Sequence, residues 1–328
     1  MSATDRIDAF QQRHPALGFP LAVFYKFFDD QGGYLAALIA YFGFVSLFPL
    51  LLLFSTVLGI VLVGNPELQQ QIIDSAMSQI PLIGDELGQP EGLSGGTGAI
   101  VIGVVGSLYG GLGVAVAAQN AMNVAWSVPK NDRPDPIRAR VRGFGLLLTV
   151  GSAVIGVTVL NGLNTAGYFG SAAKIFVTVG AIALNTATFT VAFRLGTTRS
   201  VSVRDVLPGA VIGALLWQAL QSFGSLYVQR VVGGAETTNG VFAIVLGLLA
   251  FLYLSSIALV LCIEVNVVRA DTLYPRSLLT PFTDNVELTD GDRDAYTAQA
   301  EAQRSKGFEE IEVRFGQPDS AEAGEASR

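Results

Sequence analysis

Long stretches without a charged residue constrain this chain more than any other feature. The 36 residues between Asp30 and Glu67 contain no Asp, Glu, Lys or Arg, and neither do the 38 residues between Glu91 and Lys130. Only 14% of the 328 residues are charged and 51% are hydrophobic, whereas a soluble globular domain carries about 25% charged residues. Apolar stretches of 18 or more residues are typical of transmembrane helices. The sequence therefore predicts a polytopic integral membrane protein.

Six apolar runs are long enough to cross about 30 Å of hydrocarbon as helices. They cover residues 34–63, 97–127, 143–165, 175–193, 206–229 and 241–265. We expect an all-α fold in which residues 34–270 form a bundle of six transmembrane helices. Residues 1–33 form a cytoplasmic segment with an interfacial helix, and residues 271–328 form an acidic, largely disordered cytoplasmic tail.

The basic residues predict the orientation of this bundle. When the loops are assigned alternately to the two sides, 18 of the 20 Lys and Arg residues fall on one side, with only Lys174 and Arg230 on the other. Basic residues favour the cytoplasmic side, so both termini are expected there. The net charge of −7 has a separate origin, since residues 283–328 hold 12 acidic and 5 basic residues while the remainder is neutral.

Three segments outside the runs have patterns of their own. Residues 16–30 carry apolar side chains near helical spacing, which is typical of an amphipathic helix lying in the membrane interface. Residues 65–81 begin with Asn65-Pro66, an N-cap followed by a proline in the first turn, and predict an outer helix that either caps the bundle or covers a cavity. Beyond Pro281 the composition favours disorder, with a short helix at most around residues 290–313.

Polar side chains inside the runs are few and come in pairs. Amides three residues apart share one helix face, and they allow two readings: hydrogen bonds between helices, or a polar path for a solute or lipid headgroup. The only acidic or basic residue in the runs is Glu264, at the cytoplasmic end of the last one; this scarcity argues against a proton-coupled carrier and favours movement down a gradient. With Asn266, Glu264 is expected to form an inner gate against an arginine such as Arg138 or Arg142. The candidate path residues are Ser46, Pro49, Asn120, Asn123, Asn161, Asn164, Gln218, Gln221, Glu264 and Asn266.

Signatures of catalysis and metal binding are absent from the sequence. It has no Walker loop, no His-Glu-x-x-His, no Cys-x-x-Cys and no Gly-x-Ser-x-Gly motif, which are common marks of nucleotide, metal or nucleophile chemistry. The single histidine, His14, precedes the first run, and the single cysteine, Cys262, lies in the last. We therefore expect no catalytic residues, metal, cofactor or nucleic-acid partner, and no enzymatic activity.

Several local motifs resemble one family of bacterial inner-membrane proteins. Ala36–Phe42 followed by Ser46–Pro49, then Ala121–Trp126, then Phe251–Ser256 with Glu264–Asn266, are similar in order and spacing to motifs of the YihY/BrkB family, sometimes labelled ribonuclease BN. This resemblance implies six transmembrane helices with cytoplasmic termini in a bacterial plasma membrane. The family has been linked to envelope integrity, virulence and lipid movement. Two departures are Cys262-Ile263 before the closing glutamate and Asn239-Gly240 where Tyr-Gly is usual.

Two functions remain open from the sequence. The first is a transporter or flippase that moves or handles a lipid or amphiphilic solute, with membrane lipids as partners and the candidate path residues in contact with the headgroup. The second is a non-transporting scaffold or envelope-assembly factor that acts through its acidic tail. A membrane ribonuclease is disfavoured by the missing catalytic groups, and a homo-oligomer stays open.

Overall fold

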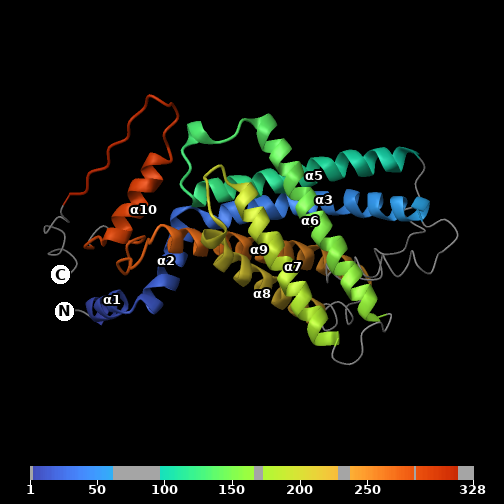
Figure 1. Ribbon diagram of the computed structural model, residues 1–328, viewed down its shortest axis with the longest axis horizontal. Coiled ribbons are helices and arrows are strands. Elements are labelled where there is room, and N and C mark those ends of the chain that lie inside the picture. The colour runs from blue at the N-terminus through green and yellow to red at the C-terminus, as the bar shows by residue number, and fades with distance from the viewer. Residues whose placement is uncertain (1–2, 62–96, 166–172, 228–236, 284–285, 317–328) are drawn as a thin grey trace.

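The protein is described here from a computed structural model, which covers residues 3–61, 97–165, 173–227, 237–283 and 286–316 (Figure 1). Within these ranges the secondary structure is entirely helical, with no strand. The expected outer helix at residues 65–81 lies outside the described residues. The expectation of an all-α protein is thus confirmed for the described part of the chain.

Six long helices of 24 to 34 residues coincide with the six apolar runs. They are α3 (Gly32–Val61), α5 (Thr97–Ala125), α6 (Pro136–Thr165), α7 (Ala173–Gly196), α8 (Val203–Tyr227) and α9 (Thr237–Ala270). Among the described residues, three segments are both long and apolar enough to cross a membrane: Val177–Gly196, Val203–Gln221 and Val245–Ala270. Gly32–Leu47, the first part of α3, is a shorter apolar segment by the same measure. Six membrane crossings therefore remain a prediction.

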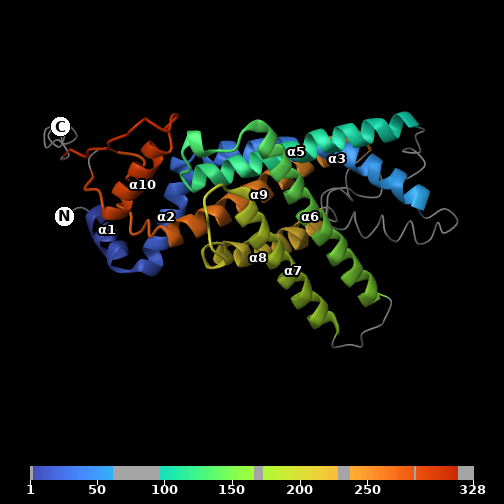
Figure 2. The same ribbon diagram turned by 45° about the horizontal axis from the view of Figure 1, so that its top comes forward.

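The long helices are connected by contacts that close into a ring. Going round it, α5 contacts α3, which contacts α9, followed by α8, α7 and α6, and α6 returns to α5. Figures 1 and 2 show α3 and α5 running side by side, while α6 and α7 form a second pair that diverges from them. The α5–α6 contact includes the first half of α6, where Gly143 lies against Ala115 and Gly111 against Leu147.

Glycines on α5 allow α3 to approach closely. A Cβ atom at Gly106 would lie 2.7 Å from the Pro49 ring, and one at Gly110 would lie 2.6 Å from the Ser46 Cα atom. Such glycine spacing is common where membrane helices pack backbone to backbone. Ser46 and Pro49 therefore lie against α5, and α3 continues through Pro49 as a single helix.

This close approach leads to a first testable prediction. Gly110→Ala places a methyl group against the Ser46 backbone, and we expect a loss of about 1–3 kcal/mol of stability because overpacking forces the helices apart. The matched control is Gly145→Ala on α6, where nothing lies within 4 Å of the new methyl group. The melting temperatures of the two purified variants test this, and an equal effect at both sites would contradict the close packing.

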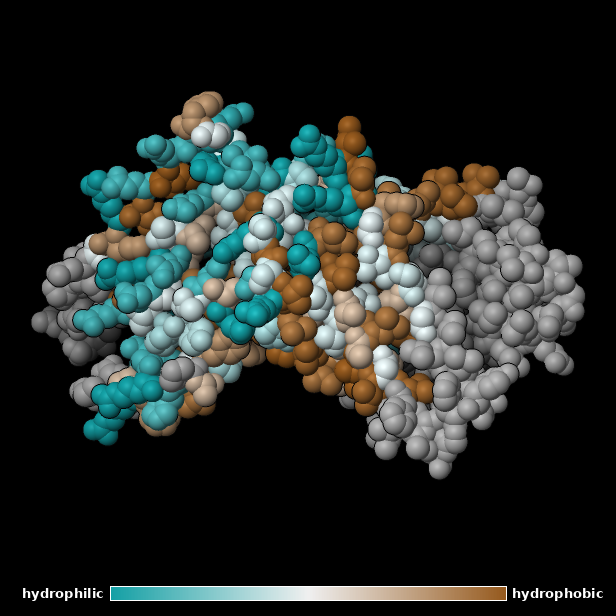
Figure 3. Space-filling model, in the orientation of Figure 1, coloured by the Kyte–Doolittle hydropathy of each residue, from teal (hydrophilic) through white to brown (hydrophobic). Residues whose placement is uncertain are grey.

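Among the described residues, the short helices and the loops that join helices gather at one end of the bundle (Figure 1). This polar end holds α1 (Ala3–Arg13), α2 (Pro15–Asp29), the 3-10 turn η2 (Lys130–Asp132) and α10 (Asp290–Glu301). Figure 3 shows hydrophilic residues over this end and hydrophobic residues over the long helices. Large apolar side chains such as Val105, Leu148 and Leu246 are more than half exposed on those helices, as expected for surfaces in contact with lipid.

Helix α2 occupies the segment for which the sequence predicts an interfacial helix. Leu17, Phe24 and Phe28 on its outer face are each more than half exposed. Ala22 and Val23 on its inner face are buried in the apolar core formed with α9. An exposed apolar face beside a docked face suits a helix at a membrane surface.

The C-terminal segment is more ordered than its composition suggests. Thr289 and Asp292 form a reciprocal capping box at the start of α10, which satisfies two backbone donors. Asp292, Ala295 and Ala302 are buried, although the sequence favours disorder with a short helix at most. Long-range contacts to the N-terminal helices supply this order, and composition alone does not reveal them. Residues 317–328 lie outside the description.

Candidate functional site: a buried ionic cluster at the polar end

Three ionisable side chains meet in the interior where α2 packs on α9. Lys26 forms an ion pair with Asp30, and its Nζ atom lies 3.9 Å from Oε2 of Glu264. The ammonium also donates a hydrogen bond of 3.1 Å to the carbonyl oxygen of Ala125, the last residue of α5. All three side chains are at most 3% exposed. We call Lys26, Asp30 and Glu264 the ionic cluster; it joins α2, α5 and α9.

Local sequence places these groups on inward faces. Lys26 lies four residues after Ala22, which is 1% exposed, and residues four apart share a helix face. Asp30 follows Lys26 by the same interval, at the end of α2. On α9, Glu264 follows the fully buried Val260 by four residues. The same periodicity that buries the apolar side chains therefore buries the charges.

The electrostatics of the cluster are dominated by burial and by mutual pairing. Burial raises the pKa of the Asp30 carboxyl, and the nearby Lys26 charge only partly opposes this shift. Burial alone would lower the pKa of Lys26, but the charges of Asp30 and Glu264 outweigh it and leave that pKa raised. Both side chains thus depend on each other for their ionised forms.

Neither carboxyl oxygen of Glu264 has a hydrogen-bond partner among the described residues, although the side chain is fully buried. Buried polar atoms are nearly always hydrogen-bonded. An unsatisfied carboxyl at a charged junction therefore requires an explanation.

A second buried charge network holds the C-terminal segment. Arg276 is fully buried, forms an ion pair with Asp292, and contacts Asp29 at 3.0 Å. Its backbone carbonyl accepts a hydrogen bond of 2.6 Å from Gln11 of α1, and its guanidinium lies 5.1 Å from the ring centre of Tyr296. We call Arg276, Asp29 and Asp292 the arginine cluster. Since Asp29 directly precedes Asp30, the two clusters are adjacent along α2.

Amides at the polar end are engaged in tying loops and helices together. Asn123 accepts hydrogen bonds from the Thr198 amide (2.9 Å) and the Thr197 hydroxyl (3.2 Å), which fixes the turn between α7 and α8. Asn266 accepts one of 2.7 Å from the Gly209 amide, and Asn120 accepts one of 3.4 Å from Arg133. These amides form hydrogen bonds between different elements, which is the first of the two roles that the sequence allows for them.

The other candidate path residues are distributed along the bundle. Ser46 donates a 2.9 Å hydrogen bond to the Gly43 carbonyl in its own helix. Gln218 and Gln221 are half-buried on α8, and Gln218 lies nine residues beyond Gly209, about 14 Å along the axis. Asn161 and Asn164 belong to α6, but their side chains are outside the described part. The eight candidate path residues whose side chains are described do not converge on one site.

The structure gives Glu264 a different basic neighbour from the one expected. Arg138 is 82% exposed and pairs with Asp135 at 3.2 Å on the first turn of α6, and Arg142 is exposed as well. The prediction that Arg138 or Arg142 closes the gate against Glu264 is therefore wrong. Lys26 takes that position because α2, unlike the start of α6, packs directly on α9.

Sequence reasoning missed Lys26 and Asp30 as site residues. Their spacing of four, with alanine and valine preceding Lys26 on the same side, was a signal for an inward pair. The apolar pattern of residues 16–30 instead predicted an amphipathic helix in the membrane interface, in which charged residues are expected on the polar face.

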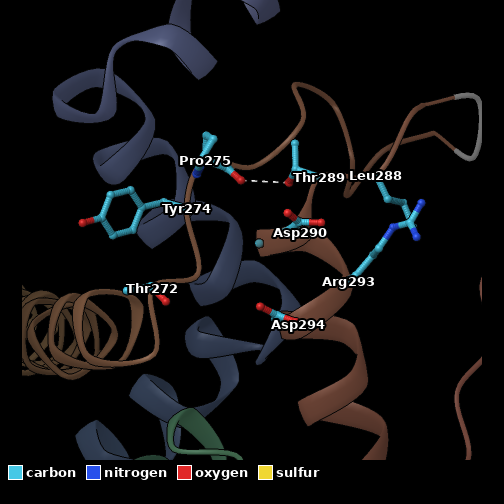
Figure 4. Close-up of a pocket in the computed structure, with 9 residues that line it drawn as sticks. Thr272, Tyr274, Pro275, Leu288, Thr289, Asp290, Arg293 and Asp294 are labelled. Atoms are coloured by element: carbon cyan, nitrogen blue, oxygen red, sulfur yellow. Dashed lines mark hydrogen bonds between the residues drawn. The ribbon is translucent and has the colours of Figure 1, made fainter.

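A pocket of about 690 Å³ lies beside the start of α10. Figure 4 shows Tyr274, Pro275, Asp290 and Arg293 around it, and the hydrogen bond between Thr289 and the Pro275 carbonyl. The capping box already uses donors of the α10 N-terminus. No group of three or more His, Cys, Asp or Glu residues suited to a metal ion occurs in the part of the chain that the structure describes.

Comparison with known proteins identifies the family. The model of the family described as Virulence factor BrkB matches residues 23–283, which include the second half of α2, all six long helices and the ionic cluster. No curated protein and no solved structure matches the chain. Since the family model spans well over half of the 328 residues, the chain belongs to the BrkB (YihY) family, as the motifs suggest.

Proposed function

We propose that this protein moves or handles a lipid or an amphiphilic solute across a bacterial inner membrane. In this proposal the six long helices all cross the bilayer, and the polar end with both termini faces the cytoplasm. Membrane lipids are then its partners, without nucleic acid and without enzymatic chemistry. The apolar exterior of the long helices, the hydrophilic surface of the polar end (Figure 3) and the basic residues Lys130 and Arg133 in the loop after α5 support this placement.

The main support for the proposal is that α8 has one buried face and one exposed apolar face. Ala210 and Ala214 on its inner face are fully buried, and Gln218 continues that face at the same spacing of four. Leu215 and Leu216 on the outer face are 51% and 38% exposed. In this proposal, the amide of Gln218 exchanges its hydrogen bonds with a passing headgroup, because an amide can both donate and accept.

The experiment compares two substitutions on α8 in vesicles that contain the purified protein. Gln218→Met keeps the length of the side chain but removes the amide, and we expect lipid movement to slow about 5- to 30-fold, corresponding to about 1–2 kcal/mol of lost headgroup contact. Leu215→Met on the outer face is the control and should leave the rate unchanged. Equal rates for both variants, at equal expression and melting temperature, would sink the assignment of Gln218.

A scaffold role is the second candidate, and the exposed end of the C-terminal segment favours it. Phe308 is 89% exposed, whereas Ala302 is buried and its carbonyl accepts a hydrogen bond from the Lys130 amide. A deletion of residues 307–328 therefore removes the segment beyond this contact and no residue of the arginine cluster. A transporter keeps its rate after this deletion, whereas a scaffold that works through the tail loses its activity in cells.

A further inference from the structure

The charges of the ionic cluster do not balance. With every group ionised, the site would hold one positive charge on Lys26 and two negative charges on Asp30 and Glu264, all nearly inaccessible to water. A buried carboxylate without its own partner is costly, and such a group usually becomes neutral instead. One proton on the two carboxyls would make the cluster neutral.

Geometry selects the carboxyl that carries this proton. Asp30 forms the direct ion pair with Lys26, whereas Glu264 lies at 3.9 Å and its two oxygens have no hydrogen-bond partner in the described part of the chain. Asp30 is within hydrogen-bonding reach of Glu264. A protonated Glu264 can donate its O–H to the Asp30 carboxylate. This gives one oxygen of each carboxyl group a hydrogen-bond partner.

The surrounding groups leave Glu264 without another source of neutralisation. Asp29 of α2 is engaged with Arg276 at 3.0 Å. Arg133, from the loop between α5 and α6, interacts with the Asp30 charge and donates hydrogen bonds to the Val128 carbonyl and to Asn120.

The polar groups of α5 and α9 nearest the cluster are also committed. The Ala125 carbonyl accepts from Lys26, and the Asn266 oxygen accepts from Gly209. Within the described ranges, Lys26 is the one basic side chain within 4.0 Å of Glu264.

We propose that Glu264 is a proton-binding site, whose proton is donated to Asp30 and keeps the junction between α2 and α9 neutral. The site goes beyond the proposed lipid function and does not depend on it. Loss of the proton adds a negative charge between the surface helix and the last long helix, which weakens their contact. Because α2 supplies both Lys26 and Asp30, the proton links the position of this surface helix to the pH.

The scarcity of charges within the apolar runs argues against proton coupling only when the runs are considered alone. In the structure, Lys26 and Asp30 form the ionic cluster with Glu264, and both lie outside those runs. A proton site is therefore available between two elements, although no single run contains one.

Infrared difference spectroscopy of the purified protein in lipid vesicles tests this directly, because a protonated carboxyl group absorbs at a different frequency from a carboxylate. We expect one protonated-carboxyl band at neutral pH in the wild type, its loss in Glu264→Gln, and its retention in Asp29→Asn. Glutamine keeps the shape of the neutral carboxyl, so this variant should fold. Absence of the band in the wild type, or its survival in Glu264→Gln, would overturn the assignment.

The melting temperature supplies a second readout. In the unfolded chain, glutamate is ionised above about pH 4.3. A folded state in which Glu264 keeps its proton therefore binds one more proton than the unfolded state does. Stability then falls as the pH rises. We expect the melting temperature of the wild type to fall between about pH 6 and pH 9, and that of Glu264→Gln to fall less over the same range. An equal slope in both proteins counts against the proposal.

Discussion

Lys26→Met destabilises the protein by about 3–5 kcal/mol, the cost expected when one partner of a buried ion pair is removed. Methionine fills a similar volume but leaves the Asp30 carboxylate in the interior without its cation. The Ala125 carbonyl also loses the hydrogen bond that it accepts from the ammonium. Thermal unfolding of the purified variant in lipid nanodiscs measures the loss.

Two controls make this result specific. Lys306→Met removes an exposed lysine and should change stability by less than about 0.5 kcal/mol. The double variant Lys26→Met with Asp30→Asn replaces the ion pair by neutral groups and should recover a large part of the loss, because the stranded charge is gone. If the single and double variants are equally unstable, packing around Lys26 accounts for the effect and the ionic cluster does not.

Arg276→Met has a comparably large expected effect, about 3–5 kcal/mol, and loosens a different part of the molecule. Asp292, which is fully buried, loses its cation, and the side chain of Asp29 loses its 3.0 Å contact. Since the Arg276 side chain connects the segment after α9 to α2 and α10, we expect residues near α10 to become accessible to protease. Cleavage there, together with a lower melting temperature, is the measurement.

The matched control for this prediction lies in the same segment. Arg314 and Glu312 form an exposed ion pair, with the two side chains 82% and 73% exposed. Arg314→Met should leave both proteolysis and melting unchanged, because exposed pairs contribute little. Cleavage that is no faster in Arg276→Met than in Arg314→Met would contradict the role of the arginine cluster.

The long helices were predictable from the sequence because hydropathy over 20 or more residues reports directly on length and burial. Their pairwise packing was partly predictable, as the glycines Gly106 and Gly110 indicate a close approach. Which helix would lie against them was not, since the sequence does not show that Ser46 and Pro49 occupy the opposite face.

The ionic cluster was only half predictable. Glu264 stands out as the sole charge within the apolar runs, but its partners come from a segment about 235 residues earlier, and the charges of that segment are equally consistent with exposure to solvent. The same difficulty affects the C-terminal segment. Arg276 and Asp292 look like ordinary surface residues until α1 and α2 cover them, so the composition of the tail favours disorder where the fold supplies order.

The central claim, that this protein moves lipid, is tested most directly by the wild type in vesicles with no imposed gradient. A fluorescent phospholipid is present in both leaflets, and a membrane-impermeant quencher is added outside. Without lipid movement, only the outer half of the label is quenched. We expect quenching well beyond half in vesicles containing the protein, and quenching that stops at half in protein-free vesicles. Quenching that stops at half in both would contradict phospholipid movement by this protein.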